Sequence, residues 1–489
     1  MYYDVNTERM VVFMKKLLTL AFTVLLLLSL TACGGQATQE NSDNSQSASD
    51  TLQIGFAKVD ITPEGNVAMA IYGAESERIS TGYLDLLYGY ALAVTGSNGE
   101  TVLILNCDHS WFPTASVGEM QRVLTQEFGL TDANIVLCGT HNHSGANLDA
   151  KDTDTARYLA KFNETMLQAA RDAMADRSEA KLYAGSAYAD NLNFVRRYVL
   201  KDGTYPNFET VSSDLIAGHE SDADNQLQVL RIVREGKKDI ALFNWQAHVN
   251  MNMQIKENYN LLTSDIFGTF RAEMENALGV ECFMFNGAAG NLNPTSQITE
   301  ENQTWNHREY GKLLSKTGIE AFHAATELGG TEVHVTSQAF TGQINHEFDN
   351  VVNQAMQVLD YYNATGDTKG AREMGQPYGI NTQKHAARIV SNAKQGKTRD
   401  IPMEAFSIGD MGFVCLHYEM FDSDGMYIKE NSPFRQTMIV GYTHQTLGYL
   451  PSKLSEDHGG YEVDNNMFVL GTAQLLADEY LKMLSTLHK

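Results

Sequence analysis

The chain has 489 residues, with 60 acidic side chains against 36 basic ones and a formal net charge of −24 at pH 7. A chain of this length can bury a large hydrophobic core, either in one large domain or in two or three average ones. The negative charge would repel a phosphate backbone, and no run of Lys or Arg offsets it, so the composition argues against nucleic acid as a partner.

The first predicted element is a secretory signal. From Met14 the sequence MKKLLTLAFTVLLLLSLTAC has two lysines, an apolar run and then small residues that end at Cys33. The apolar run is shorter than the roughly 20 residues that a membrane-spanning helix needs. The ending LTAC resembles a bacterial lipoprotein signal, which implies that Cys33 is lipidated and anchors an extracytoplasmic protein to the cell membrane. An ordinary cleaved signal with a coincidental cysteine is the alternative.

These features divide the chain into three parts. Residues 1–32 are expected to be the signal peptide with an N-terminal extension, and residues 33–51 the lipidated cysteine and a flexible tether rich in Gly, Ser, Asn and Gln. Residues 52–489 show no second linker and no internal repeat, so we expect one large domain there. Its four cysteines lie in apolar segments without a CxxC motif, which favours buried thiols over two disulfides.

Short apolar runs alternate with amphipathic helical segments after residue 52. Strands are predicted at 52–61, 91–96, 102–111, 134–143, 180–188 and 227–233, and helices at 116–129 and 155–176. The alternation predicts an α/β fold, a large domain with one or more buried mixed sheets flanked by helices. Residues 343–400 are richer in polar helix formers and are predicted to be a helical insertion, with a plain surface insertion favoured over a lid. The segment 467–487 is expected to form the closing helix.

The stretch IVLCGTHNHSGAN, at 135–147, carries the first candidate site. Residues two apart on a strand project to the same face, so His141 and His143 are both expected to face the space at the strand's C-terminal end. Open α/β sheets bind their ligands at such ends. By itself an HxH pair is equally typical of surface or hydrogen-bonded histidines, so the pair needs support from elsewhere in the chain.

Three other apolar runs end in groups that could bind a metal or a substrate. IALFNWQAHVNMN leads to His248, and MIVGYTHQTLGYLP leads to Tyr449. GFVCLHYEMF leads to Glu419, with His417 two residues before it. Each group has an ordinary explanation as well: a buried hydrogen-bonded histidine, a packed tyrosine and a solvated edge charge. Together, two imidazoles, one carboxylate and an open position for water match a catalytic zinc site.

With these motifs the sequence resembles the neutral/alkaline (non-lysosomal) ceramidase family, secreted amidases that use one zinc ion to cut the N-acyl bond of ceramide. The resemblance covers nearly all of residues 52–489 and is carried by the segments FAKVDITPEG, GTHNHSG, NFVRRY, FNWQAHVN, FNGAAGNLNP and GYLPSKLSEDHGGYE. It implies a ceramidase-like catalytic domain. It also implies one Zn²⁺ ion held by four side chains, which are His141, His248, Glu419 and Tyr449.

The same resemblance implies catalytic roles. His143 would polarise the scissile amide or handle a proton there, and Tyr461 would contact the reacting centre. Arg196 would lie near the substrate oxygen, with Arg197 as the alternative. Where ceramidases carry Gly-Asp-Val-Ser-Pro, this chain reads GNLNP, so Asn293 replaces the family's active-site serine and is expected to donate a hydrogen bond to the substrate or to the oxyanion. Because the given sequence ends soon after GGYE, we do not expect the immunoglobulin-like domain that ceramidases append.

The expected function is hydrolysis of an amide (N-acyl) bond of a lipid such as ceramide, or of a related N-acyl amphiphile, by zinc-activated water. Asp108, at the end of another predicted strand, either orients a ligand imidazole or is a structural hydrogen-bond acceptor. Two alternatives stay open: a zinc hydrolase of the same fold that acts on an ester or a carbohydrate-linked substrate, and a lipoprotein that binds a ligand without catalysis. The expected partners are a lipid or amphiphilic small molecule and, through the lipid anchor, the membrane.

Overall fold

The computed structural model describes residues 51–70, 78–206, 211–298, 305–444 and 446–488. The predicted signal peptide, Cys33 and the tether up to residue 50 lie outside these ranges. Across the described part of the chain, no helix combines the length and the apolar character that crossing a bilayer requires.

The larger of two stacked sheets contains nine strands. In spatial order they are β13 (Glu281–Asn286), β11 (Ile240–Trp245), β10 (Gln226–Arg234), β6 (Ser178–Tyr188), β1 (Leu52–Asp60), β3 (Tyr88–Thr95), β4 (Thr101–Cys107) and β5 (Ile135–Gly139), and β15 (Thr326–Glu327) pairs with β6. Most neighbours run antiparallel, but β4 and β5 are parallel, as are β11 and β13. In each parallel pair the two C-terminal ends lie at the same edge of the sheet, where polar loops can meet.

The second sheet has four strands, in the order β16 (Val333–Gln343), β17 (Thr398–Ile408), β18 (Met411–Cys415) and β20 (Gln436–Val440). The first three run antiparallel, and β18 and β20 are parallel. Its inner face packs on the larger sheet, and the core between the sheets includes Phe283 and Phe285 of β13, Phe406 of β17 and Phe413 of β18. Removing such side chains from water, at about 25 cal/mol per Å² of apolar surface, holds the two sheets together.

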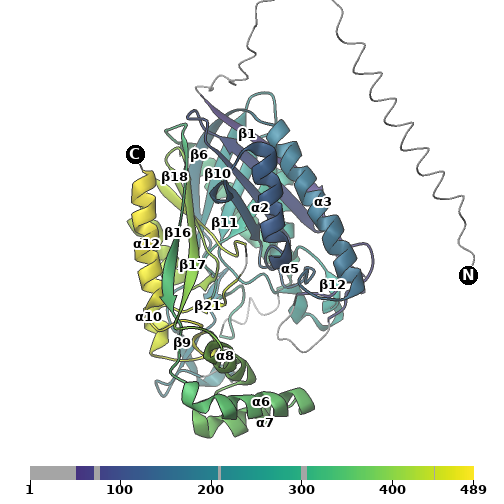
Figure 1. The fold of residues 1–489 in the computed structure, drawn as a ribbon. Coiled ribbons are helices and arrows are strands. Elements are labelled where there is room, and N and C mark those ends of the chain that lie inside the picture. The colour runs from purple at the N-terminus through teal and green to yellow at the C-terminus, as the bar shows by residue number, and fades with distance from the viewer. Residues whose placement is uncertain (1–50, 71–77, 207–210, 299–304, 445, 489) are drawn as a thin grey trace, which may run out of the picture. The chain divides into compact units, whose positions relative to one another are not determined.

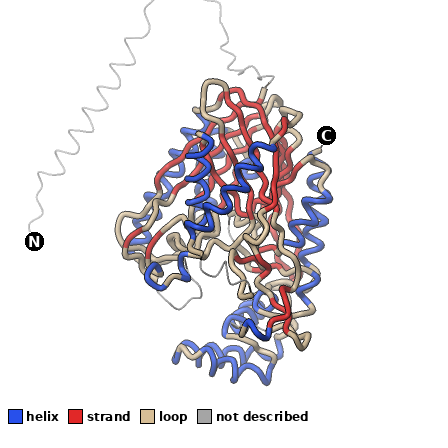
Figure 2. The backbone as a smooth tube through the Cα atoms, turned by 180° about the vertical axis from the view of Figure 1, so that it is seen from behind, coloured by secondary structure: helices blue, strands red, loops and turns tan. Residues whose placement is uncertain are grey.

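Helices cover the outer faces of both sheets, so the layers run from helices through two sheets to helices again (Figures 1 and 2). Over the larger sheet lie α2 (Thr114–Phe128), α3 (Thr153–Ala175), α4 (Asp265–Leu278) and α5 (His307–Ala324), and over the smaller one α9 (Asp422–Asn431) and α12 (Thr472–Leu487). Helix α3 shows why the sequence folds this way. Its residues Tyr158, Phe162 and Met166 recur every four positions and are all buried, and the Asp152 side chain caps its N-terminus by accepting from Thr155 N at 2.9 Å.

The burial of the central strands follows from this layering. Every residue of β4 and β5 is buried, because one face meets the helices and the other meets the second sheet. Burial on both faces explains why these strands are continuous apolar runs in the sequence. The predicted fold class, α/β with a large mixed sheet flanked by helices, is confirmed. Four buried cysteines are free thiols, namely Cys107, Cys138, Cys282 and Cys415.

The predicted helical segment at 343–400 lies between β16 and β17. It contains α6 (Val352–Thr365), α7 (Thr368–Gly375) and α8 (Gln383–Ala393), which form a small core of their own at the bottom of Figure 1. The closing helix begins at Thr472 rather than at 467, because Gly471 has a φ of 89° and cannot continue a helix.

Short elements complete the chain near the ends of the long strands. The paired ones are β2 (Gly82–Tyr83) with β12 (Leu261–Leu262), β7 (Phe194–Val195) with β14 (Leu292–Asn293), β8 (Tyr198–Leu200) with β9 (Ile216–His219), and β19 (Glu419–Met420) with β21 (Tyr449–Leu450). Two short helices, α10 (Lys453–Glu456) and α11 (Tyr461–Asp464), follow β21.

Candidate metal centre

The candidate site lies beyond the C-terminal ends of parallel strands. The chain leaves β5 and reaches His141 and His143, and it leaves β11 and reaches His248. Beyond β18 lies Glu419, which is in register with Tyr449 in the parallel pair β19–β21. Segments that are far apart in the sequence therefore supply one site.

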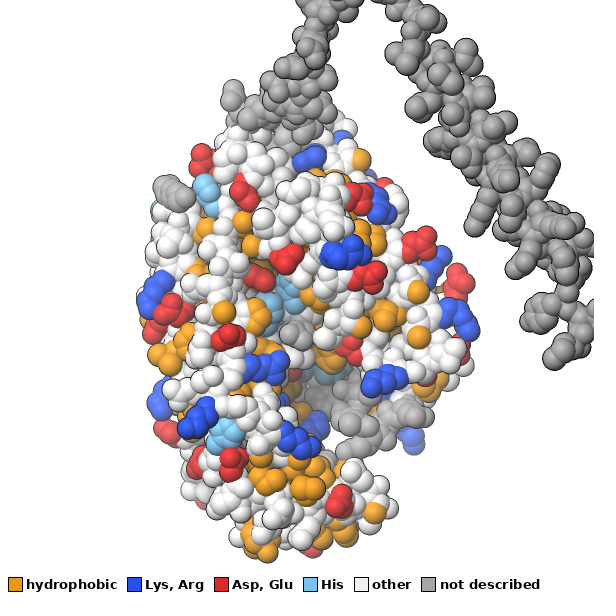
Figure 3. Space-filling view, in the orientation of Figure 1, with side chains coloured by type: hydrophobic (Ala, Val, Ile, Leu, Met, Phe, Trp, Pro, Cys, Tyr) orange, Lys and Arg blue, Asp and Glu red, His pale blue; other side chains and the backbone are white. Residues whose placement is uncertain are grey.

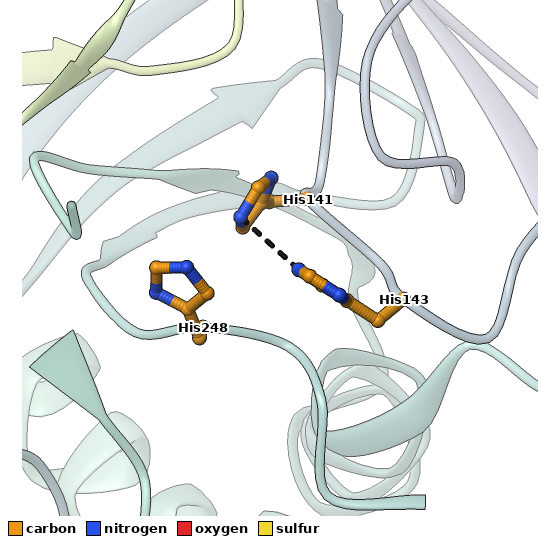
Figure 4. A group of neighbouring side chains, drawn as sticks. All are labelled: His141, His143 and His248. Carbon is orange, nitrogen blue, oxygen red and sulfur yellow. Dashed lines mark hydrogen bonds between the residues drawn. The ribbon is translucent and has the colours of Figure 1, made fainter. Parts of the chain in front are cut away.

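Three imidazoles meet there (Figure 4). The Nε2 atoms of His141 and His143 are 3.2 Å apart, and the ring centroids of His141 and His248 are 4.7 Å apart. One nitrogen of each ring lies within 4.8 Å of a nitrogen of each of the other two. The three rings are close enough to surround one ion.

The sequence pattern predicted that the two histidines of the HxH motif project from a strand. In the structure they lie beyond the end of that strand instead. Strand β5 ends at Gly139, and His141 has a left-handed φ of 60°. The turn is fixed by Asn142, whose side chain donates to the carbonyls of Asp108 at 3.0 Å and Thr263 at 2.7 Å. A left-handed non-glycine residue costs about 1–3 kcal/mol, and such strain persists where the surrounding structure imposes it. The loop, rather than the period of a strand, brings the two rings together.

Glu419 completes the cluster. Its Oε2 lies 3.4 Å from the Nε2 atoms of both His141 and His248. In a tetrahedral zinc site with metal–ligand distances of about 2.0 to 2.1 Å, neighbouring ligand atoms are about 3.3 to 3.4 Å apart. His248 Nε2 and Glu419 Oε2 are buried and have no hydrogen-bond partner among the described residues, although buried polar atoms normally have one. The donor set and its spacing therefore fit a divalent ion.

The backbone selects the tautomer of His248. Its Nδ1 lies 2.9 Å from the carbonyl oxygens of both Ala289 and Leu292. Carbonyl oxygens only accept hydrogen bonds, so Nδ1 carries the hydrogen and the lone pair is on Nε2. This arrangement points a ready metal ligand at the centre.

Burial sets the protonation states at the centre. It lowers the pKa values of His141, His143 and His248 well below the usual histidine value, so these imidazoles are neutral near pH 7. Burial raises the pKa of Glu419, and the positive charge of Arg196 opposes that rise. Neutral imidazoles are the form of histidine that binds metals.

Of the two candidate arginines, Arg196 is the one at the site. Its Nη2 donates to the Tyr449 hydroxyl at 3.1 Å, and its Nε donates to Glu462 at 2.8 Å. Arg197 instead donates to Glu220 at 2.7 Å and to the other oxygen of Glu462 at 2.9 Å. The structure thus separates the two arginines that the sequence left as alternatives.

Tyr461 lies at the same end of the sheets. Its ring centroid is 5.4 Å from that of Tyr449, and burial raises its pKa to about 12, so the phenol is protonated and can donate. Lys384 Nζ donates to the Tyr461 hydroxyl at 2.8 Å. Lys384 belongs to α8, in the helical insertion, and the sequence did not reveal it, because a single lysine in an amphipathic helix carries no mark of the distant residue it meets.

Two further predicted residues, Asn293 and Asp108, have different surroundings. Asn293 lies on β14, and its Oδ1 is 3.5 Å from Asn250 Nδ2. Asp108 accepts from Arg271 at 2.6 Å and from the backbone N–H of Tyr88 at 3.0 Å. These partners support the structural alternative for Asp108 over the orientation of an imidazole.

A cavity of about 600 Å³ opens beside Arg196 and Tyr461. This is enough room for a small-molecule ligand. Figure 3 shows the surface hollowed above the helices α6 and α7. The cavity lining mixes amide and apolar side chains, among them Gln254, Asn293, Gln297, Met251, Ile255 and Trp305.

Comparisons with known proteins found a family model and solved structures that are similar to this chain. The family model described as neutral/alkaline non-lysosomal ceramidase, N-terminal, matches residues 52–392. The chain is similar to the crystal structure of the neutral ceramidase from Pseudomonas aeruginosa, with 18% sequence identity, a TM-score of 0.66, and coverage of 90% of this chain and 75% of that one. A structure described as ceramidase complexed with C2 gives a TM-score of 0.64 at 18% identity, with coverage of 90% and 75%. Curated protein sequences gave no match.

Proposed function

The chain belongs to the neutral/alkaline, non-lysosomal ceramidase family, and on this basis we propose that it is a zinc-dependent amidohydrolase of N-acyl lipids. The family and the fold support a hydrolase, and the buried histidines suit a metal ion. The proposed reaction is cleavage by water of the amide (N-acyl) bond of ceramide or of a related amphiphile.

The observation that carries this proposal is that two buried metal-ligand atoms, His248 Nε2 and Glu419 Oε2, converge beside His141 without a hydrogen-bond partner in the described part of the chain. The proposed ligands are these three residues and Tyr449, which is in register with Glu419 and hydrogen-bonds to it. When bound there, zinc would supply Lewis acidity and a hydroxide nucleophile near neutral pH.

The surrounding residues have proposed roles in the same step. His143 is a neutral imidazole within 3.2 Å of His141, so it can accept a proton and pass it to the leaving amine. Arg196 and Tyr461 offer donors for the charge that develops on the carbonyl oxygen. Loss of one such donor typically costs about 10²- to 10³-fold in rate.

Asn293 takes the position of the family's serine and lines the cavity. Its amide can hydrogen-bond a substrate or an oxyanion but cannot act as a nucleophile. We expect Asn293→Ala to reduce turnover without abolishing it, and complete loss of hydrolysis with full metal content would contradict the supporting role.

Replacing His248 tests the proposal. His248→Ala should lose both the zinc of this centre and the hydrolysis of long-chain N-acyl amides. The reason is that the carbonyls of Ala289 and Leu292 orient the His248 ring as a metal ligand, and alanine has no such ring. His143→Ala is the matched comparison, because its nitrogen belongs to the same group of three but we assign it a proton-transfer role. It should keep the zinc and lose activity. Zinc loss in His143→Ala would make His143 a ligand, and full zinc in His248→Ala would contradict the assigned centre.

The amide side chains of the cavity favour a second candidate. Gln254, Asn293 and Gln297 would suit a polar, carbohydrate-linked amide or ester better than a bare hydrocarbon chain. A panel that compares ceramides with N-acylated sugars and with esters of equal chain length decides between the two. Preference for the sugar-linked compounds would replace the lipid assignment while keeping the metal chemistry.

We also propose that Cys33 anchors the protein to the extracytoplasmic side of the membrane, on the support of the signal-like sequence that precedes it. Partition between membrane and soluble fractions tests this. Cys33→Ala should move the protein out of the membrane fraction, and an unchanged distribution would rule out the anchor.

A further inference from the structure

The short helix α11, which carries Tyr461, depends on other parts of the chain for its position. It has only four residues, and it follows Gly459 and Gly460, whose φ angles of 64° and 99° are left-handed. A single helical turn is not stable by itself, because nucleating a helix costs more than one turn of hydrogen bonds returns. The side-chain contacts of α11 therefore determine where Tyr461 points.

These contacts come from two places in the fold. The first is the pair of arginines near the candidate metal centre: one oxygen of Glu462 accepts from Arg196 at 2.8 Å, and the other accepts from Arg197 at 2.9 Å. The second is α8, the helix of the insertion that lies nearest the sheets (Figure 1). Just before α8, Asn381 Nδ2 donates to the two oxygens of Asp464 at 3.0 and 2.9 Å. The insertion thus packs on the last residue of α11.

Lys384, in the first turn of α8, contacts the Tyr461 side chain itself. This lysine is partly buried, and its Nζ donates to the Tyr461 hydroxyl at 2.8 Å. An ammonium group has donors and no acceptor, so the phenol oxygen accepts this bond and keeps its own hydrogen for another acceptor. The same hydroxyl hydrogen-bonds to Tyr449. It therefore lies between Lys384 and the candidate metal centre.

We propose that Lys384 is a positioning residue for the reaction, which holds the Tyr461 hydroxyl at the metal centre as a hydrogen-bond donor. This inference rests on the proposed function, in which Tyr461 donates to the charge that develops on the carbonyl oxygen. A hydrogen bond from a charged group is stronger than one between neutral groups, and it polarises the O–H group that accepts it. Through Lys384, the helical insertion acts on the chemistry of a centre that lies outside it.

The alternative is that Lys384 only fastens the insertion to the rest of the domain. The two roles differ in how they depend on Tyr461. A positioning residue acts through the Tyr461 hydroxyl, so its removal has no further effect on turnover once that hydroxyl is gone. A fastening residue stabilises the domain whether or not the hydroxyl is present, so the two effects multiply.

The test is a double-mutant cycle on the full-length protein in detergent, with a long-chain ceramide as substrate. Lys384→Met should lower kcat about tenfold with little change in KM and no loss of zinc. Lys384→Arg keeps a charged donor and should recover most of that loss. Lys384→Met/Tyr461→Phe should be no slower than Tyr461→Phe. Lys394→Met is the matched control, because it removes an exposed lysine at the C-terminal end of the same helix and should keep the wild-type kcat.

Two results would overturn the inference. One is a double variant that is slower than Tyr461→Phe by the full factor seen for Lys384→Met alone. The other comes from crystal structures of the wild type and Lys384→Met, in which we expect the Tyr461 ring to turn away from Tyr449 once the lysine is lost; an unmoved ring would contradict the positioning. This comparison needs no activity. If the wild type hydrolyses no N-acyl amide, the proposed function fails, and the ring position still decides whether Lys384 places Tyr461.

Discussion

Arg196 joins the candidate metal centre to a buried network of charges. One oxygen of Glu462 accepts from Arg196 at 2.8 Å, and the other accepts from Arg197 at 2.9 Å. Arg197 also pairs with Glu220 at 2.7 Å. Glu462 therefore fixes the direction in which Arg196 presents its remaining N–H groups to Tyr449.

This geometry predicts that Glu462 contributes to the reaction by positioning Arg196. Glu462→Gln keeps a hydrogen-bond acceptor but removes the charge that holds Arg196, so we expect kcat to fall about tenfold while KM changes little. The zinc content should stay the same. Glu220→Gln is the control, because it weakens the same network at Arg197 and should lower stability without that loss of kcat.

Individual residues were predictable from the sequence only where the signal was local. His141, His143, His248 and Glu419 each follow an apolar run, and a strand that ends in a polar group is visible in a single sequence. The pairing of Lys384 with Tyr461 joins residues in separate elements, and nothing near either one marks it. The choice between two adjacent arginines likewise depended on which side chain faces which carboxylate.

At the scale of elements, the strand ends were easier to predict than the backbone beyond them. The predicted strand at 134–143 is β5 at Ile135–Gly139, followed by the left-handed turn at His141. Apolar runs identify buried strands but do not mark where the ladder of hydrogen bonds stops. The sequence also did not predict how the strands divide between two stacked sheets, because that division depends on contacts between distant segments.

Helix α9 carries a carboxyl group whose burial should make stability depend on pH. Burial, with help from the charges of Asp422 and Glu456, raises the pKa of Asp424 from 3.8 to about 7. The folded protein thus holds this proton more tightly than the unfolded chain does. The resulting stabilisation is complete below about pH 4 and is lost as the pH rises through about 7.

Asp424→Asn should remove this pH dependence. At pH 8 the variant should be more stable than the wild type, by at most about 4 kcal/mol from a shift of roughly three pKa units. At pH 5 the two should differ little. Urea unfolding at both pH values measures this, with the exposed Glu64→Gln as control. Equal stabilisation at both pH values would show that packing, rather than the proton, is responsible.

At the scale of the whole molecule, the candidate metal centre ties together both halves of the fold. His141 follows a strand of the larger sheet, whereas Glu419 follows a strand of the smaller one. The unfolded chain cannot keep these ligands together, so an ion bound there stabilises only the folded state. At a free zinc concentration of 100 times Kd, that stabilisation is about 2.7 kcal/mol.

Removing the metal should therefore lower the melting temperature of the entire domain, not only of the loops that hold the ion. We expect a fall of several degrees after chelation, measured by calorimetry at a fixed scan rate, and recovery when zinc is restored. The size of the recovery should grow with the logarithm of the zinc concentration, as linkage requires. His248→Ala should show little response to either treatment. A melting temperature that is indifferent to chelation in the wild type would mean that no ion bridges the two sheets, because a ligand that binds only the folded state must raise the temperature at which it unfolds.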